Sequence, residues 1–309
     1  MSKFSGILIC SDIDGTFAGE TFFEENISAV KYFIQNGGKF TFITGRAQDY
    51  LRQEPFCNLI NAPAGIFNGG LIYDYKTETV LKKIGLDFTV QEFMQAIQSL
   101  PECTKVHIFD QSGAHIIIQG TDSIPPSLLA EKPLKIVCNF ATEQIADEFK
   151  QEAKKSVFFK NNCISKSWSL GVEFNGAGAS KGNALDFLKT YLKDIHTAIG
   201  VGNYDNDIPL IQHADMGVAV GDAQESVKQV ADIVVKPCAQ YAIKDLIEIL
   251  EKTALKMLET LTTSCVIVGI HRSKRDLLQE PEVQEWAESR GFKINIIAVD
   301  FYTLEISEK

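Results

Sequence analysis

Short apolar runs that end in polar or glycine-rich turns constrain the fold of this chain more than any other feature. Such runs span residues 7–11, 40–43 and 198–202, and residues 64–67 form a fourth. Runs of this length that stop at a turn are typical of strands buried in a parallel sheet. Segments with apolar residues at helical spacing, such as residues 26–35, lie between them. This alternation predicts an α/β domain with a Rossmann-like parallel sheet covered by helices.

The pattern changes between residues 83 and 178. Residues 105–109 and 115–119 alternate polar and apolar side chains across Asp-Gln-Ser-Gly, which predicts an antiparallel hairpin. Short antiparallel strands with two helices indicate an α+β domain inserted into the α/β domain. Further strands are expected at 134–140, 157–160, 164–167 and 171–174, and helices at 89–100 and 142–154. We therefore assign residues 1–82 plus 179–252 to the core domain and 83–178 to the insertion.

A helix is expected at residues 241–261, and residues 253–309 are assigned to a C-terminal extension of β-α-β type. Within it, strands at 265–270 and 293–299 flank a helix at 281–290. Three placements are open for this unit: an edge of the sheet, a separate appendage, or a contact between two copies of the chain in a homo-oligomer.

The net charge of −10 argues against non-specific binding to nucleic acid, because phosphate backbones attract basic surfaces. Apolar stretches as long as a membrane span, about 18 residues, do not occur, and the N-terminus lacks the pattern of a secretory signal. Seven cysteines without a CxxC pair suggest reduced thiols. We expect a cytoplasmic protein that does not bind membranes.

Two carboxylates, Asp12 and Asp14, directly follow the first strand. In open parallel sheets, ligands bind at the carboxyl ends of the strands. Two carboxylates there suit a hard cation such as Mg²⁺, and one can act as a nucleophile while the other transfers protons. Gly15 permits the turn that brings both to one site. A turn with solvated aspartates is the alternative for this pair taken alone.

Three other turns carry groups that suit a phosphate or a metal. Thr44-Gly45-Arg46 ends the second strand, where a hydroxyl and backbone N–H groups can bind an anion or only cap a helix. Lys181 opens a helix, a position that the macrodipole disfavours, so it either holds a phosphate or is solvated. Residues 202–207, Gly-Asn-Tyr-Asp-Asn-Asp, offer oxygen ligands for a metal or form a turn rich in Asn and Asp. Their common position after strands favours a single site.

This ordered set of motifs resembles the haloacid dehalogenase superfamily, and within it the Cof-type, subclass IIB, sugar-phosphatase-like hydrolases. The resemblance covers about residues 5–250 and rests on DIDGT at 12–16, TGR at 44–46, NGG at 68–70, KG at 181–182 and GNYDND at 202–207. It implies that the inserted α+β domain is a cap that closes over the site. It also implies Mg²⁺-dependent hydrolysis of a small phosphorylated metabolite such as a sugar phosphate.

The resemblance also implies roles for individual residues. Asp12 would attack phosphorus and form an aspartyl-phosphate, and Asp14 would protonate the leaving oxygen and then activate water. The implied phosphate-binding residues are Thr44, Gly45, Arg46, Asn68, Lys181 and Asn206. The implied metal site comprises Asp12, Asp14, Asn203 and Asp207, and Asp207 would also support Lys181.

One departure from the family pattern concerns Asn203, because the family usually has Asp at this position. An amide oxygen still binds Mg²⁺ but lacks the negative charge, so we expect weaker metal affinity, and Asp205 is a candidate to compensate. Two other functions stay open. A phosphotransferase or phosphomutase of the phosphomannomutase type would use the same kind of cap, and a non-catalytic phosphometabolite-binding or regulatory protein would explain Asn203.

The sequence does not name the substrate, because cap side chains would select it. Polar and aromatic candidates in the cap are His107, His115, Lys160, Lys166 and Trp168. Surface or core packing is the more common role for each of these residue types, so none is assigned to the site.

Overall fold

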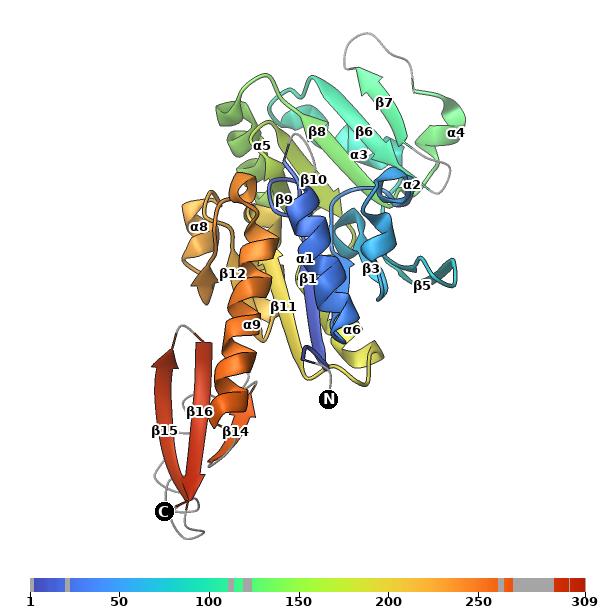
Figure 1. The fold of residues 1–309 in the computed structure, drawn as a ribbon. Helices are drawn as coiled ribbons and strands as arrows, with labels where there is room; N and C mark the ends of the chain where they lie inside the picture. Colours follow the sequence, from blue (N-terminus) through green and yellow to red (C-terminus); the bar gives the residue numbers. More distant parts are fainter. Residues whose placement is uncertain are drawn as a thin grey trace.

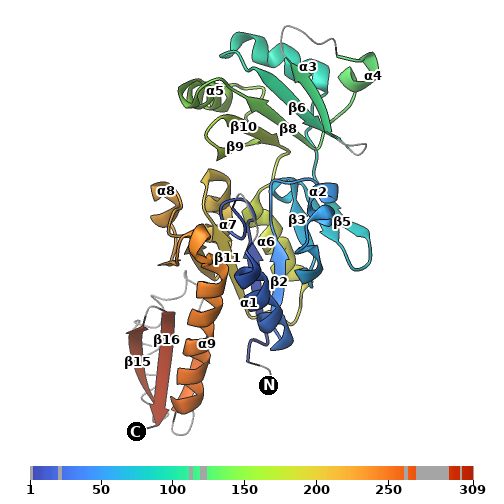
Figure 2. The ribbon, with the colours of Figure 1, turned by 45° about the horizontal axis from the view of Figure 1, so that its top comes forward.

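The structure is a computed structural model that describes residues 3–19, 23–110, 114–118, 124–260, 264–268, 292–299 and 301–308. Beyond residue 252 it describes helix and strand positions but no side chains. Figures 1 and 2 show a core, a cap at one end of the core, and a C-terminal extension next to the last helix.

The core is built on a five-stranded sheet. In spatial order it contains β13 (Ile233–Val234), β12 (Met216–Ala219), β11 (Thr197–Gly202), β1 (Ile7–Ser11) and β2 (Lys39–Phe42). Every neighbouring pair of these strands is parallel. The predicted α/β fold with a parallel sheet is therefore confirmed, and the carboxyl ends of all five strands meet at one edge.

Helices cover both faces of this sheet, because alternate side chains of each buried strand point to opposite faces. On β1, Ile9 packs in the cluster that holds Val30 and Leu246, whereas Leu8 packs in the cluster that holds Leu185 and Leu210. The first face is covered by α1 (Glu24–Gln35) and α9 (Ala242–Thr260), and the second by α6 (Lys181–Tyr191) and α7 (Ile208–His213). The core also contains the short helices α2 (Gln48–Gln53) and α8 (Glu225–Lys228).

The strand expected at residues 64–67 differs from its prediction. β3 (Ala64–Ile66) touches the parallel sheet through a single bridge between Ile43 and Gly65. Its main partner is the antiparallel strand β4 (Leu71–Asp74), which pairs with β5 (Thr79–Lys83); neither β4 nor β5 was predicted. The chain reverses here because residues 67–69 all have positive φ values, a conformation that forms a tight turn.

The inserted cap contains a five-stranded antiparallel sheet. Its spatial order is β7 (Ala114–Ile118), β6 (Lys105–Phe109), β8 (Lys135–Asn139), β10 (Gly171–Asn175) and β9 (Cys163–Trp168). One face packs on α3 (Val90–Ala96), α4 (Pro126–Leu129) and α5 (Glu143–Lys155) through a cluster rich in phenylalanine. The cap sheet lies over the carboxyl edge of the core sheet (Figure 2). This architecture confirms the predicted α+β insertion.

The prediction of a strand at residues 157–160 is wrong. The segment forms a turn in which the amide of Phe159 donates to the carbonyl of Ser156. The amide of Asn162 in turn donates to the carbonyl of Phe159. Phe159 is buried in the cap core, whereas Val157 is 78% exposed. One buried side chain in an otherwise exposed apolar run gave the appearance of a strand.

The C-terminal extension forms a sheet of its own. β14 (Ser264–Val268) and β15 (Phe292–Val299) agree with the two predicted strands, and both pair with β16 (Phe301–Glu308), which was not predicted. The helix expected at 281–290 lies outside the described residues.

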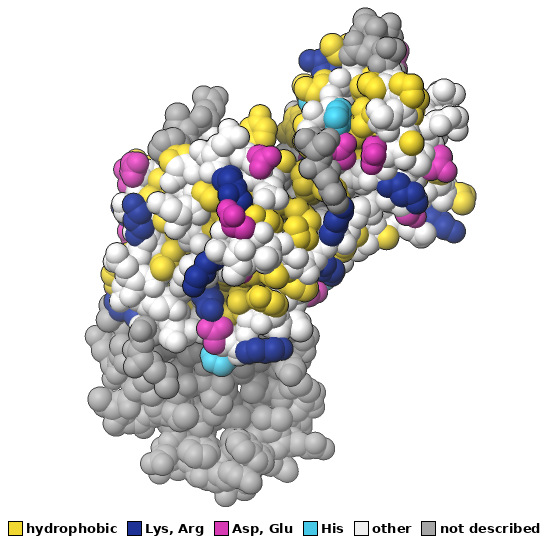
Figure 3. All heavy atoms as spheres, turned by 90° about the vertical axis from the view of Figure 1, so that its right-hand side faces the viewer, with side chains coloured by type: hydrophobic (Ala, Val, Ile, Leu, Met, Phe, Trp, Pro, Cys, Tyr) yellow, Lys and Arg dark blue, Asp and Glu magenta, His cyan; other side chains and the backbone are white. Residues whose placement is uncertain are grey.

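Figure 3 shows the cap as a lobe that projects from the core, with basic and acidic side chains interspersed on both. Among the described residues, none of the helices combines the length and apolar character needed to cross a membrane.

Candidate active site

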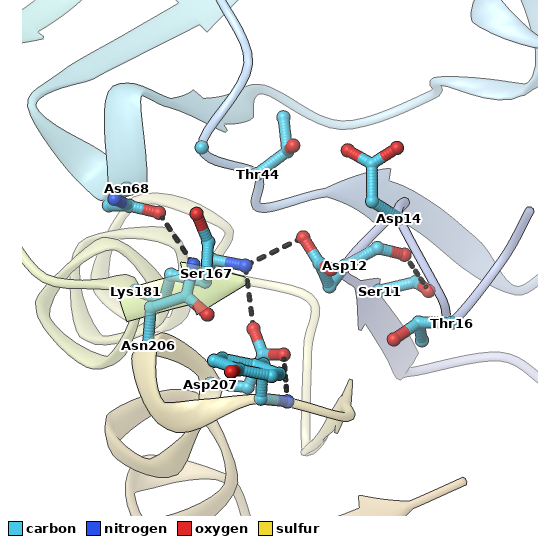
Figure 4. Close-up of polar contacts among 12 residues, drawn as sticks. Ser11, Asp12, Asp14, Thr16, Thr44, Asn68, Ser167, Lys181, Asn206 and Asp207 are labelled. Atoms are coloured by element: carbon cyan, nitrogen blue, oxygen red, sulfur yellow. Dashed lines mark hydrogen bonds and ion pairs between the residues drawn. The ribbon is translucent and has the colours of Figure 1, made fainter. Parts of the chain in front are cut away.

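A buried ion triad lies at the carboxyl edge of the core sheet. Lys181 donates to Asp12 and to Asp207 at 2.6 Å each (Figure 4). Lys181 is 1% exposed, Asp12 is 6% exposed and Asp207 is fully buried. The two carboxylates explain why a lysine occupies the first turn of helix α6, where the macrodipole alone would disfavour it. Three motifs far apart in the sequence therefore meet at one point, as predicted.

Burial dominates the electrostatics of Asp12. The pKa of Asp12 is raised to about 7, mainly because its carboxyl group is removed from water; Lys181 lowers this pKa, whereas Asp207 and Asp14 raise it. The two carboxylates more than offset the burial of Lys181 and raise its pKa above the usual value. Lys181 is therefore a permanent positive charge beside the Asp12 carboxylate.

Asp207 supports this arrangement from below. Its Oδ2 atom accepts hydrogen bonds from the amides of Asn203 and Tyr204 at 2.9 and 3.0 Å, while Oδ1 accepts from Lys181. Both carboxylate oxygens are thus occupied by donors. The geometry favours the predicted supporting role for Asp207 over direct ligation of a metal.

Asp14 lies beside Asp12 but faces a different partner. Its carboxylate accepts from Arg46 through Nε at 2.9 Å and Nη2 at 2.6 Å, and Arg46 also pairs with Glu54. The Asp14 side chain is 59% exposed, in contrast to Asp12. Gly15, at φ +75°, allows the chain to turn directly after Asp14. One carboxylate is thus buried next to a lysine, and the other is accessible.

The predicted phosphate loop follows β2. The amide of Thr44 donates to the carbonyl of Gly65 at 2.8 Å, and its hydroxyl accepts from the amide of Arg46 at 3.2 Å. Figure 4 shows the Thr44 side chain near Asp12 and Asp14. The carbonyl of Gly45 accepts from Lys135 of the cap at 3.0 Å. The loop is held by both domains.

Asn68 and Asn206 connect the cap to the core. The Asn68 side-chain amide donates to Glu173 at 2.5 Å and to Asn175 at 3.1 Å, both in the cap. Its oxygen accepts from Asn206 at 3.1 Å. These contacts use both N–H donors of Asn68, so its side chain links the two domains, and phosphate binding by Asn68 and Asn206 stays a prediction.

The residues assigned to Mg²⁺ fit an oxygen-ligated cation. Asn203 lies against the turn that carries Asp12 and Asp14: its amide oxygen accepts from Thr16 at 3.2 Å, and a Cβ at Gly15 would collide with its amide nitrogen. Asp12, the Asp14 carbonyl and Asn203 would supply only oxygens, the ligands that Mg²⁺ prefers. In the described part of the chain, no group of three or more His, Cys, Asp or Glu side chains is arranged around a metal site.

Asp205, the residue considered as a substitute ligand for Asn203, contacts the cap. Its carboxylate accepts from Lys150 at 2.6 Å and from the amide of Lys166 at 3.1 Å, and both partners belong to the cap. Asp205 therefore forms a further polar contact between core and cap.

A cavity of about 420 Å³ lies between the triad and the cap sheet. Its floor includes Asp12, Asp14 and Arg46. Its roof is the face of the cap sheet that the cap helices do not cover. This face contributes His107, Phe109, Lys135, Val137, Asn139, Ser167, Trp168 and Glu173. This volume is within the usual range for small-molecule sites.

Two of the five cap candidates line this cavity, namely His107 and Trp168. Lys166 instead pairs with Asp147 at 2.6 Å, and neither His115 nor Lys160 is part of the lining. Sequence reasoning missed Lys135 and Glu173. The available signal was their alternation with buried apolar neighbours, which placed polar side chains on one face of the cap sheet.

The family model described as haloacid dehalogenase-like hydrolase matches residues 9–247. A 5-amino-6-(5-phospho-D-ribitylamino)uracil phosphatase, YcsE of Bacillus subtilis, is 24% identical over 230 residues, which cover 74% of this chain and 88% of the relative. The pyridoxal phosphate phosphatase YbhA of Escherichia coli is 25% identical over 256 residues, which cover 74% of this chain and 92% of the relative.

The solved structure of BT4131, described as a sugar phosphatase of subclass IIB, superposes with a TM-score of 0.65. The match covers 78% of this chain and 97% of that one at 20% identity. At this identity the likeness establishes the fold, including the type of cap.

Proposed function

Because the chain belongs to the haloacid dehalogenase-like hydrolases and is a phosphatase, we propose that it hydrolyses small phosphomonoesters through an aspartyl-phosphate on Asp12, with Mg²⁺ as cofactor. The observation that carries this proposal is the buried triad of Asp12, Lys181 and Asp207, in which Asp12 lines the floor of a cavity sized for a metabolite. A carboxylate held beside a permanent cation suits attack on a phosphoryl group.

In the first step, an Asp12 carboxylate oxygen bonds to phosphorus while the bond from phosphorus to the alcohol oxygen breaks. Asp14 must first exchange its contact with Arg46 and take up a proton from solvent, and it then gives that proton to the alcohol oxygen. Lys181 stabilises the negative charge on the phosphoryl oxygens, and Mg²⁺, when bound, supplies further positive charge there.

In the second step, Asp14 takes a proton from water, and the water oxygen bonds to phosphorus. The bond between phosphorus and Asp12 breaks, which releases inorganic phosphate and restores the carboxylate. Asp14 is suited to both transfers because it lies beside Asp12 and its side chain is 59% exposed.

The test is a phosphatase screen of the purified chain with Mg²⁺. The panel contains sugar phosphates, nucleotides, pyridoxal phosphate and p-nitrophenyl phosphate as a generic substrate. We expect release of inorganic phosphate that disappears with EDTA and returns with Mg²⁺. An isomerised sugar phosphate without phosphate release would favour the phosphomutase alternative. No turnover of any substrate would favour the binding protein.

Substitution of Asn203 by Asp tests the proposed metal site. The added negative charge is expected to lower the Mg²⁺ concentration for half-maximal activity about tenfold, because ligand charge strengthens binding of hard cations. The measurement is a Mg²⁺ titration of the initial rate.

Asn36→Asp provides the matched control, since it adds the same charge at the end of α1, outside the cavity lining. An unchanged Mg²⁺ requirement in Asn203→Asp would remove Asn203 from the metal site.

A further inference from the structure

A buried ion pair in the cap forms part of the cavity roof. Lys135 on β8 and Glu173 on β10 are 2.6 Å apart, and they are 3% and 2% exposed. Burial of two charges is costly even when they are paired, and well-packed apolar residues often serve stability equally well. Stability therefore gives no sufficient reason for this pair.

The hydrogen bonds of the pair leave capacity for a ligand. A lysine ammonium has three N–H donors, and Lys135 uses two of them, on Glu173 and on the carbonyl of Gly45 at 3.0 Å. Its other described neighbour is the ring of Phe109, at 6.0 Å from the ring centroid. One N–H donor remains.

The carboxylate of Glu173 also retains one acceptor position. Its Oε1 atom accepts from Lys135 and from Ser167 at 2.8 Å, and its Oε2 atom accepts from Asn68 at 2.5 Å. A carboxylate has about four acceptor positions, so one is left on Oε2.

The pair lies next to the expected position of the phosphoryl group. Lys135 contacts Gly45 of the phosphate loop, and both members of the pair line the same cavity as Asp12. The spare donor and the spare acceptor therefore lie where the first atoms of the leaving group would be. A hydroxyl group suits both, because it accepts from one neighbour and donates to another.

The charges around the cavity disfavour an anionic leaving group. Among the described lining residues, each lysine and arginine is already paired: Arg46 with Asp14 and Glu54, and Lys135 with Glu173. Burial lowers the pKa of His107, so its ring is neutral at pH 7. Arg46 keeps Glu54 as a partner even when Asp14 exchanges its contact, so a second negative charge on the substrate would find no uncommitted cation among these described lining residues.

We propose that Lys135 and Glu173 are the specificity-determining pair of this site, which selects neutral, hydroxyl-bearing leaving groups over anionic ones. This inference rests on the proposed phosphatase function. It assigns selection to two cap residues that also contact the core, since Lys135 bonds to Gly45 of the phosphate loop and Glu173 to Asn68.

The test compares substrates that differ only in this charge. Glycerol 3-phosphate carries a hydroxymethyl group where 3-phosphoglycerate carries a carboxylate. Sorbitol 6-phosphate and 6-phosphogluconate form a second pair that differs in the same way. We expect wild-type kcat/KM to favour the neutral member of each pair. Glu173→Gln frees the charge of Lys135 while it keeps an acceptor oxygen, so the ratio is expected to shift at least about tenfold toward the anionic member. Lys135→Met is expected to shift the kcat/KM ratio toward the neutral member of each pair.

Lys150→Met is the matched control. Lys150 also forms a 2.6 Å ion pair between cap and core, with Asp205, but it is not part of the cavity lining. It is expected to leave the substrate ratio unchanged even if it weakens cap docking. Circular dichroism and thermal melting check the fold of each variant, and Glu173→Gln, which preserves shape, decides the question if Lys135→Met does not fold.

Three outcomes would overturn the inference. The first is a wild-type preference for the anionic substrates. The second is an equal loss of kcat/KM on both members of each substrate pair in Glu173→Gln, which would indicate a packing role for Glu173. Turnover of p-nitrophenyl phosphate in either case shows that the proposed function still holds. The third is inactivity of the wild type on every substrate, which would reject the proposed function itself.

Discussion

Replacement of Asp12 by Asn is expected to lower kcat/KM about 10⁴-fold, or about 5.5 kcal/mol of transition-state stabilisation. The change preserves the size of the side chain but removes the nucleophilic carboxylate, and an amide oxygen cannot form the aspartyl-phosphate. Asp12 is buried at 2.6 Å from Lys181, whereas the neighbouring Asp14 carboxylate pairs with Arg46, so we expect no other carboxylate to replace it as the nucleophile. Initial rates on the best substrate of the screen measure the loss.

The covalent intermediate gives a second measurement. Acid quench and mass spectrometry are expected to detect a phosphorylated peptide that contains Asp12 in the wild type and none in Asp12→Asn. The control is Asp215→Asn, since Asp215 also accepts from a lysine at 2.6 Å and from a backbone amide, but outside the cavity lining. Full activity of Asp12→Asn alongside an unaffected control would show that another residue is the nucleophile.

The convergence of Asp12, Lys181 and residues 202–207 was predictable from the sequence. Asp12 and residues 202–207 each follow a buried strand, and parallel strands place their carboxyl ends at one edge. Lys181 alone could have been solvated, and its place among the motif-bearing turns favoured the same site. Local pattern and sheet geometry were sufficient for these groups because the backbone alone determines where they lie.

The connection between cap and core was not predictable in the same way. Asn68 lies 105 residues before Glu173, and no periodicity in the chain indicates that their side chains meet. A charged residue in an alternating strand is normally expected to face water, so Lys135 and Glu173 gave no sign of burial. The same limit applies to Asp205, whose partners in the cap depend on how the two domains dock.

The antiparallel strands β4 and β5 were missed for a related reason. The turn at residues 67–69 depends on positive φ values at Phe67 and Asn68, and phenylalanine rarely adopts this conformation. The Asn-Gly-Gly motif indicated a turn after β3, but it did not indicate the direction in which the chain leaves that turn.

Replacement of Lys181 by Met is expected to lower kcat/KM about 10²- to 10³-fold, the loss typical of one preorganised group that stabilises charge in the transition state. Methionine has a similar length but no charge, so the phosphoryl oxygens lose the cation beside Asp12. The carboxylates of Asp12 and Asp207 then lie buried without their shared partner, which is expected to destabilise the fold by about 3–5 kcal/mol.

Lys189→Met separates these two effects. Lys189 lies on the same helix and pairs with Asp215 at 2.6 Å, but it is partly exposed and is not part of the cavity lining. We expect near wild-type kcat/KM for Lys189→Met, whereas Lys181→Met should be slow even at temperatures where thermal melts show it to be fully folded. Equal activity of the two folded variants would remove Lys181 from the phosphoryl-binding residues and leave it a structural role, because its loss would then affect only the free energy of unfolding.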